Sequence, residues 1–162
     1  MKRWFCLILL GWAAAAGAHE TPEAAVAALW RALSHGPGQG ADRAALEALF
    51  APDAQIYGLT DKDGRRALRR RTAAEFIDAQ ARLDASAFHE REVHRAVRRY
   101  ADFAEVFATV ESRTDPGAKA ADFTGVNSLH LVELDGRWRI IALYYALERP
   151  GQPLPAGWRS GH

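Results

Sequence analysis

The chain has almost no cysteine, and none of its apolar runs is long enough to cross a membrane comfortably. Cys6 is the single cysteine, and the apolar run of residues 4–16 falls short of the roughly 20 residues of a transmembrane helix. This run follows Lys2 and Arg3 and leads into Ala16-Gly17-Ala18, a combination typical of a secretory signal peptide. Residues 1–18 are therefore predicted to be a signal peptide cleaved after Ala18, and an uncleaved anchor is the alternative.

Cleavage would leave a mature chain without cysteine. Such a chain has no disulfide, thiol nucleophile or thiolate metal ligand, even though an exported protein could have used disulfides. Without Lys2 and Arg3, the 21 basic residues become 19 against 20 acidic residues. This near-neutral balance gives no reason to expect nucleic acid or a membrane as a partner. We expect a periplasmic or secreted protein that is stabilised by packing.

Motifs for metals, phosphates and nucleotides are also absent from the sequence. His89 and His94 are five residues apart, so on a strand their side chains point to opposite faces and do not form a ligand pair. The sequence contains no phosphate loop, nucleophile elbow or dinucleotide fingerprint. We therefore expect no metal site and no cofactor.

The mature chain carries three helix starts, all of them before residue 88. Thr21-Pro22-Glu23 and Asp42 are N-cap signals, and Thr72 with Glu75 forms a capping box. Two short strands are predicted at about 55–59 and 66–70, on either side of a turn at Asp63-Gly64. From Phe88 on, a period of two predicts strands at about 88–100, 103–113, 123–134 and 137–147. Helices followed by a run of antiparallel strands predict an α+β fold. We expect a single domain of residues 19–155 and a flexible tail of residues 156–162.

The turn at Asp135-Gly136 fixes which side chains of the last two strands share a face. A type I′ turn there pairs 127 with 144, 129 with 142, 131 with 140 and 133 with 138. A turn at Ala101-Asp102 pairs 93 with 110, 95 with 108 and 97 with 106. The paired residues named above belong to the inner face of the sheet. Strict alternation then places the side chains of Glu90, Glu92, His94 and His130 on the outer face.

The inner face of this sheet is apolar at one end and polar at the other. The apolar end carries Val97, Val106, Leu131 and Ile140. The polar end carries Arg91, Ser112, Asn127 and Tyr144, with Arg95 between the two ends. A sheet of this kind, curved round the helices, predicts a cone whose mouth is the polar end.

Seven side chains are candidates for contacting a small hydrophobic ligand in this cone. They lie at the polar end, add aromatic surface or interrupt an apolar stripe, and they are Asn127, Tyr144, Tyr57, Trp30, Arg95, Ser112 and Gln80. An inward Arg95 could bind a ligand carboxylate through its planar guanidinium. The alternative is that these side chains satisfy one another or complete the core.

Several segments together resemble the nuclear transport factor two-like superfamily, with its ketosteroid isomerase-like and polyketide cyclase (SnoaL-like) members. The segments are LFAPDAQIYG, TAAEFI, FHEREVHRAVRRY, FAEVFATVESR, GVNSLHLVELDGRWRIIALYY and ERPGQPLP, and they cover nearly all of residues 21–155. The resemblance implies a cone-shaped curved sheet wrapped round three N-terminal helices, a pocket in the cone and a homodimer formed through the sheet. It implies no single activity, because this fold hosts many unrelated functions.

No catalytic set carries over from the resemblance, so the catalytic residues stay unknown. The isomerase-like enzymes use a pocket carboxylate with a tyrosine and a second acid, whereas the apolar part of the predicted inner face has no carboxylate. The dehydratase-like members use His and Asp, whereas His94 and His130 fall on the outer face. Asp53 and Asp78 are the carboxylates left to test as a general base.

Three functions stay open on the sequence alone. The first is an exported domain that binds a small hydrophobic molecule without chemistry, which the lack of an inward acid favours. The second is a cofactor-free isomerase or dehydratase acting on an apolar cyclic substrate. The third is a dimeric interaction module with a vestigial pocket.

Overall fold

Three α-helices, six strands and a short 3-10 helix build the part of the chain that the computed structural model describes, residues 19–62 and 65–159. The helices are α1 (Pro22–Leu33), α2 (Arg43–Leu49) and α3 (Ala73–Gln80). The strands are β1 (Phe50–Lys62), β2 (Arg65–Thr72), β3 (His89–Tyr100), β4 (Phe103–Arg113), β5 (Phe123–Leu134) and β6 (Arg137–Leu147). The predicted signal peptide lies outside the described residues. Among the described helices, none is long and apolar enough to cross a membrane.

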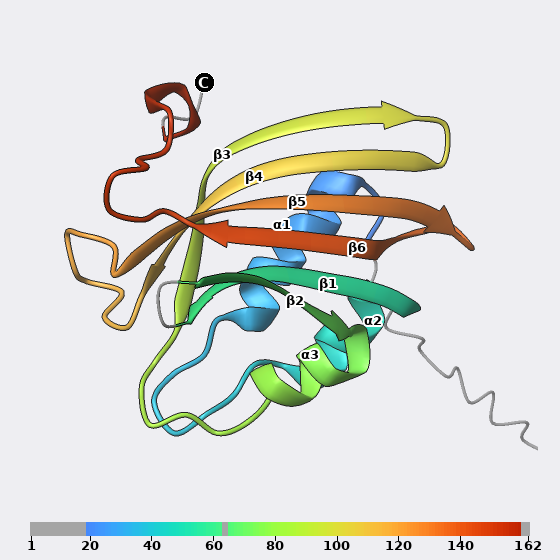
Figure 1. The fold of residues 1–162 in the computed structure, drawn as a ribbon. Helices are drawn as coiled ribbons and strands as arrows, with labels where there is room; N and C mark the ends of the chain where they lie inside the picture. The colour runs from blue at the N-terminus through green and yellow to red at the C-terminus, as the bar shows by residue number, and fades with distance from the viewer. Residues whose placement is uncertain (1–18, 63–64, 160–162) are drawn as a thin grey trace, which may run out of the picture.

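The strands form one curved sheet in the order β2-β1-β6-β5-β4-β3, with the helices along its concave side (Figure 1). Neighbouring strands run antiparallel except β1 and β6, which are parallel. The α+β fold and the curved sheet are confirmed, with the correction that the sheet is mixed and not wholly antiparallel. Strands β3 to β6 match their predicted bounds to within one residue, whereas β1 extends well beyond the predicted 55–59.

The three predicted helix starts are confirmed by their caps. The N-cap side chains of Thr21, Asp42 and Thr72 each accept a hydrogen bond from the backbone N–H three residues on, at 3.1, 3.0 and 3.2 Å. Glu75 completes a capping box by accepting a hydrogen bond from Thr72 N at 2.8 Å. Each helix therefore begins where its own local sequence satisfies the free N–H groups.

The two predicted hairpin turns are also confirmed. Asp135 and Gly136 have φ of 52° and 72°, the positive values that a type I′ turn requires. Ala101 has φ of 48°, so the β3–β4 turn forms even though alanine disfavours this conformation. The turns of both hairpins therefore lie at the end of the sheet where β6 begins.

The hydrophobic core fills that same end of the cone. Trp138 is fully buried there, and the Arg99 guanidinium lies 4.6 Å from its ring centroid. Other fully buried side chains around it include Leu29, Leu46, Leu49, Leu129, Leu131 and Ile140. Dense packing at this end leaves the opposite end of the sheet, where β6 finishes, to enclose a cavity.

The C-terminal segment crosses the convex side of the sheet. A short 3-10 helix, η1 (Ala156–Trp158), places the Trp158 ring 4.9 Å from the Phe107 ring of β4. Arg159 forms an ion pair with Glu148. The predicted tail of residues 156–162 therefore begins in contact with the outer face of the sheet.

Trp138→Ala is expected to lower the free energy of unfolding by about 3–5 kcal/mol, because it empties a fully buried site. Trp158→Ala is the matched control, since that ring is 38% exposed and its loss is expected to cost at most about 1 kcal/mol. Urea denaturation followed by circular dichroism measures both. Equal losses in the two variants would contradict this location of the core.

Candidate functional site

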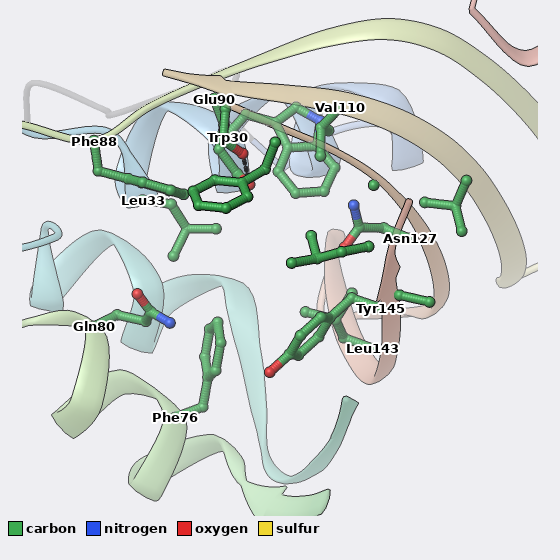
Figure 2. A pocket seen from close by; sticks show the side chains of 16 residues that line it. Trp30, Leu33, Phe76, Gln80, Phe88, Glu90, Val110, Asn127, Leu143 and Tyr145 are labelled. Carbon is green, nitrogen blue, oxygen red and sulfur yellow. Dashed lines mark hydrogen bonds between the residues drawn. The ribbon is translucent and has the colours of Figure 1, made fainter. Parts of the chain in front are cut away.

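A cavity of about 280 Å³ opens between α1, α3 and the concave face of β3 to β6. Its wall is mostly aliphatic and aromatic, and its polar side chains are Gln80, Glu90, Ser112, Asn127 and Tyr145. Figure 2 shows Glu90 beside Trp30 on one side, Asn127 and Tyr145 on the strands across from it, and Gln80 on α3. Polar groups from five elements thus converge on one apolar hollow.

Glu90 of β3 is the acidic side chain of this wall, and burial changes its chemistry. Ser112 Oγ donates a hydrogen bond to Glu90 Oε1 at 3.3 Å. Glu90 Oε2 is buried and has no hydrogen-bond partner within residues 19–62 and 65–159. Burial raises the pKa of Glu90 from its ordinary value of 4.5 to about 7, against a smaller lowering by the Ser112 hydrogen bond. The carboxyl group can therefore gain or lose a proton near neutral pH.

The inward position of Glu90 results from a β-bulge in β3. The predicted pairs 95–108 and 97–106 are confirmed, but the register then shifts and leaves Val93 as the extra residue. Glu92, and not Val93, lies opposite residue 110, and Glu90 lies opposite Ser112. The expectation that Glu90 and Glu92 face solvent and that the cone holds no carboxylate is wrong, because strict alternation fails at a bulge.

Glu92 lies on the same face but is fully paired. Trp30 Nε1 donates to Glu92 Oε2 at 2.7 Å, and Arg95 contacts the two carboxylate oxygens at 2.8 Å through Nε and Nη2. Arg95 Nη1 also donates to the backbone oxygen of Glu23 at 3.2 Å. Arg95 is therefore held by protein groups and does not line the cavity, so its predicted contact with a ligand carboxylate does not fit this arrangement.

A second bulge, in β6, decides which tyrosine faces the cavity. The pairs 131–140 and 133–138 are confirmed, but beyond them Ile141 is the extra residue and Asn127 pairs with Tyr145. The predicted pairs 127–144 and 129–142 are wrong for the same reason as in β3. Tyr145 lines the cavity, whereas Tyr144 lies on the convex face and is 36% exposed.

Gly58 makes room for the Tyr145 ring. A Cβ atom on Gly58 would lie 2.4 Å from Tyr145 Cζ and 2.5 Å from its hydroxyl oxygen. The ring thus lies over a position of β1 that has no side chain. Sequence reasoning missed Tyr145, and a glycine inside a strand was the sign that a large neighbour approaches there.

Four of the seven predicted ligand contacts line the cavity, namely Asn127, Trp30, Ser112 and Gln80. Asn127 is only 7% exposed, and its amide belongs to the polar part of the wall. Tyr57, Tyr144 and Arg95 are not part of the lining. Tyr57 lies on the convex side of β1, because its neighbour Ile56 is buried on the concave side.

The two acids predicted as candidate bases, and His130, do not line the cavity. Asp53 is exposed, and Asp78 pairs with Arg43 at 2.7 Å on the surface, so neither can serve as a base in the cone. His130 contacts Phe103 with ring centroids 5.8 Å apart, outside the cavity as predicted. Within the described residues, no group of His, Cys, Asp and Glu could hold a metal ion.

Arg91, predicted at the mouth, lies instead on the convex face of β3. Its guanidinium forms an ion pair with Glu111 at 2.7 Å. The bulge at Val93 turns Arg91 to the convex face and Glu90 and Glu92 to the concave face. The mouth of the cone therefore carries acidic side chains where a basic side chain was expected.

Solved structures of low sequence identity share this fold. An NTF2-like protein of unknown function from Silicibacter pomeroyi is 22% identical, with a TM-score of 0.52 and coverage of 78% of this chain and 92% of that one. Another from Shewanella baltica is 14% identical, with a TM-score of 0.55 and coverage of 77% and 89%. A putative ketosteroid isomerase from Parabacteroides distasonis is 14% identical, with a TM-score of 0.54 and coverage of 80% and 89%. At these identities the likeness concerns the fold alone.

Comparison with curated proteins gave no match. Residues 22–146 match the family described as putative lumazine-binding. This span contains the three helices, strands β1 to β5 and nearly all of β6, and with them almost the whole cavity wall. The chain therefore has an NTF2-like fold and belongs to the putative lumazine-binding family.

Proposed function

We propose that the chain binds a small, largely apolar ring compound in the cavity of the cone. The observation that carries this proposal is an apolar wall around a buried carboxyl group, Glu90, whose single hydrogen-bond partner among the described residues is Ser112. Pockets for small molecules commonly combine apolar walls with a few placed polar groups. The match to the putative lumazine-binding family supports a ligand-binding domain.

The size and polarity of the cavity support a ligand of one or two rings. Its volume of about 280 Å³ lies at the lower edge of the roughly 300–1,000 Å³ typical of small-molecule pockets. Asn127 and Gln80 each offer both a donor and an acceptor from their amide groups. Lumazine, a bicyclic heterocycle with N–H and C=O groups, belongs to this size class.

A cofactor-free acid–base enzyme is the second candidate, and Glu90 is the observation that favours it. A general base or acid works best when its pKa lies near the operating pH, and the pKa of Glu90 is about 7. The Tyr145 hydroxyl lines the same cavity and could donate to a developing oxyanion. An isomerase of this kind would use Glu90 to move a proton between two carbons of an apolar cyclic ketone.

We also propose that the protein acts in the periplasm or outside the cell, as a homodimer formed through the sheet. The signal-peptide pattern of residues 1–18 supports export, and N-terminal sequencing of protein from the native host tests cleavage after Ala18. Ile141 and Tyr144 on the convex face are 38% and 36% exposed and would contribute apolar surface to a dimer. A monomeric mass by light scattering would refute the dimer.

Tyr145→Phe and Tyr144→Phe form a matched pair for the binding test. Each variant loses one hydroxyl group, but only Tyr145 lines the cavity. Against one- and two-ring compounds that include lumazine, we expect Tyr145→Phe to weaken binding about 2–10-fold, because a lost hydrogen bond is worth about 0.5–1.5 kcal/mol. Tyr144→Phe should bind as wild type in isothermal titration calorimetry. A panel without any binding compound would refute the proposal.

Proton exchange tests the enzyme candidate. With β,γ-unsaturated cyclic ketones in deuterated buffer, we expect exchange at the α-carbon whose rate rises with pH through about 7 as Glu90 ionises. Glu90→Gln should lower that rate by roughly 100-fold or more. Glu111→Gln, on the outer face, should leave it unchanged. Failure of wild type to exchange any such ketone would eliminate the enzyme and leave the binding proposal untouched.

The raised pKa of Glu90 predicts that stability falls as pH rises. Between pH 4.5 and about 7 the folded chain keeps a proton on Glu90 that the unfolded chain has released. This contribution to stability is complete below pH 4.5 and is lost as pH passes 7, a change of about 3 kcal/mol. Urea denaturation from pH 5 to 8 should show the free energy of unfolding of Glu90→Gln rising relative to that of wild type by about 3 kcal/mol. A difference independent of pH would contradict the burial of this carboxyl group.

A further inference from the structure

We propose that the cavity selects an organic cation, a protonated amine or nitrogen heterocycle, whose N–H group binds the Glu90 carboxylate and whose charge lies among the aromatic rings of the wall. This inference rests on the proposed function, because it assigns a ligand class to the same cavity. It goes beyond that function by excluding anions and ranking cations above neutral compounds.

The charges of the cavity wall support a cation. Among the 16 described residues that line the cavity, Glu90 is the single carboxylic acid, and none is lysine, arginine or histidine. A ligand carboxylate or phosphate would therefore meet Glu90 with no compensating base, which is costly in an apolar surrounding. A cationic ligand would instead be attracted, because the ionised Glu90 carboxylate supplies the negative charge that balances it.

Arg95 of β3 and Arg113 of β4 already form ion pairs with other acids. Arg95 contacts Glu92 at 2.8 Å, and Arg113 contacts Glu111 at 2.8 Å. No positive charge contributes to the pKa of Glu90, which reflects burial and the Ser112 hydrogen bond. The described residues thus leave the Glu90 carboxylate without a counter-charge of its own.

The hydrogen bonds of the Glu90 carboxyl group also favour a cationic ligand. Glu92, two residues along the strand, accepts hydrogen bonds from Trp30 and from Arg95 Nη2, and Arg95 Nε adds an ion-pair contact. Glu90 accepts a single hydrogen bond, from Ser112, and its Oε2 is left without a donor among the described residues. An ionised carboxylate accepts hydrogen bonds from several donors, so a ligand N–H group would supply a donor to Glu90 Oε2.

Aromatic side chains surround the position that such a charge would take. The rings of Trp30 and Phe88 lie on the same side of the cavity as Glu90, and those of Phe76 and Tyr145 lie across the opening (Figure 2). A cation near aromatic faces is attracted by their quadrupoles, most strongly when it is shielded from water. The Trp30 indole is held in place by its hydrogen bond to Glu92 at 2.7 Å.

Titratable and charged groups near Glu90 come from β3, β4, β6 and the loop after α1. They are Glu92, Arg95, Glu111, Arg113, Tyr145 and His35, the last in contact with Phe88 at a ring-centroid distance of 6.1 Å. Glu92 pairs with Arg95, and Glu111 pairs with both Arg113 and Arg91. The packed helix α3 contributes Phe76 and Gln80 to the wall, neither of which titrates.

Probes of similar shape and different charge test the inference. 2-Naphthylmethylamine, 2-naphthylmethanol and 2-naphthoate are titrated into the wild-type protein by calorimetry at pH 7.5, with benzylamine, benzyl alcohol and benzoate as a smaller set. We expect each amine to bind at least tenfold more tightly than its alcohol and each carboxylate to bind most weakly. From pH 6 to 8, affinity for the amine should rise about tenfold as Glu90 ionises, while affinity for the alcohol stays constant.

Three variants assign this preference to Glu90. Glu90→Gln keeps the size of the side chain and should weaken binding of the amine at least tenfold, with the alcohol changed less than threefold. Glu111→Gln removes an acid from the outer face and should keep the preference for the amine. His35→Gln should keep the rise in affinity between pH 6 and 8.

Equal binding of amine and alcohol, tighter binding of the carboxylate, or binding confined to neutral compounds would overturn the cation inference and leave the ligand-binding proposal standing. Absence of binding for all six probes and for the whole panel of ring compounds would overturn both. If Glu90→Gln does not fold, the probe comparison and the pH series on wild type decide the matter alone.

Discussion

Two β-bulges, at Val93 in β3 and Ile141 in β6, decide what the inside of the cone contains. From the packed end of the sheet, side chains alternate regularly through Val97 and Ile140, and the extra residue then reverses the parity of each strand. The reversal turns Glu90 and Tyr145 toward the concave side. Because a bulge also bends its strand, the irregularities that add curvature to the sheet also bring two of the polar groups into the cavity.

The sequence allows the fold to be predicted because its signals are local. Caps such as Thr72 with Glu75 and the turn at Asp135-Gly136 act over a few residues and need no tertiary context. The cavity wall is predictable on the helices and on the regular strands, where Trp30, Gln80, Asn127 and Ser112 were identified. Beyond Val93 the hydrophobic pattern favours the parity that buries valine and exposes acid, so burial of Glu90 contradicts the rule from which register is inferred.

The fold separates the region that stabilises it from the region that holds the cavity. A buried carboxyl group with a single hydrogen bond costs stability relative to an apolar residue of similar size. The chain tolerates this loss of stability at Glu90 because Trp138 and the aliphatic core pack the far end of the sheet, away from the polar side chains of the cavity. Deviations from efficient packing that cluster in one hollow are typical of a binding site.

Glu90 and Glu92 differ by two positions on one strand face, yet the protein treats them in opposite ways. Glu92 joins Trp30 of α1 to Arg95 of β3, so a structural role accounts for all of its contacts. The backbone N–H of Glu90 is equally well fixed, since it donates to Ser34 Oγ at 3.0 Å. Its carboxyl group, by contrast, keeps an oxygen atom without a donor among the described residues. A side chain held in position but left electrostatically incomplete suits a ligand that supplies the missing donor, and it makes Glu90, more than Asn127, the residue on which a function in this cavity would depend.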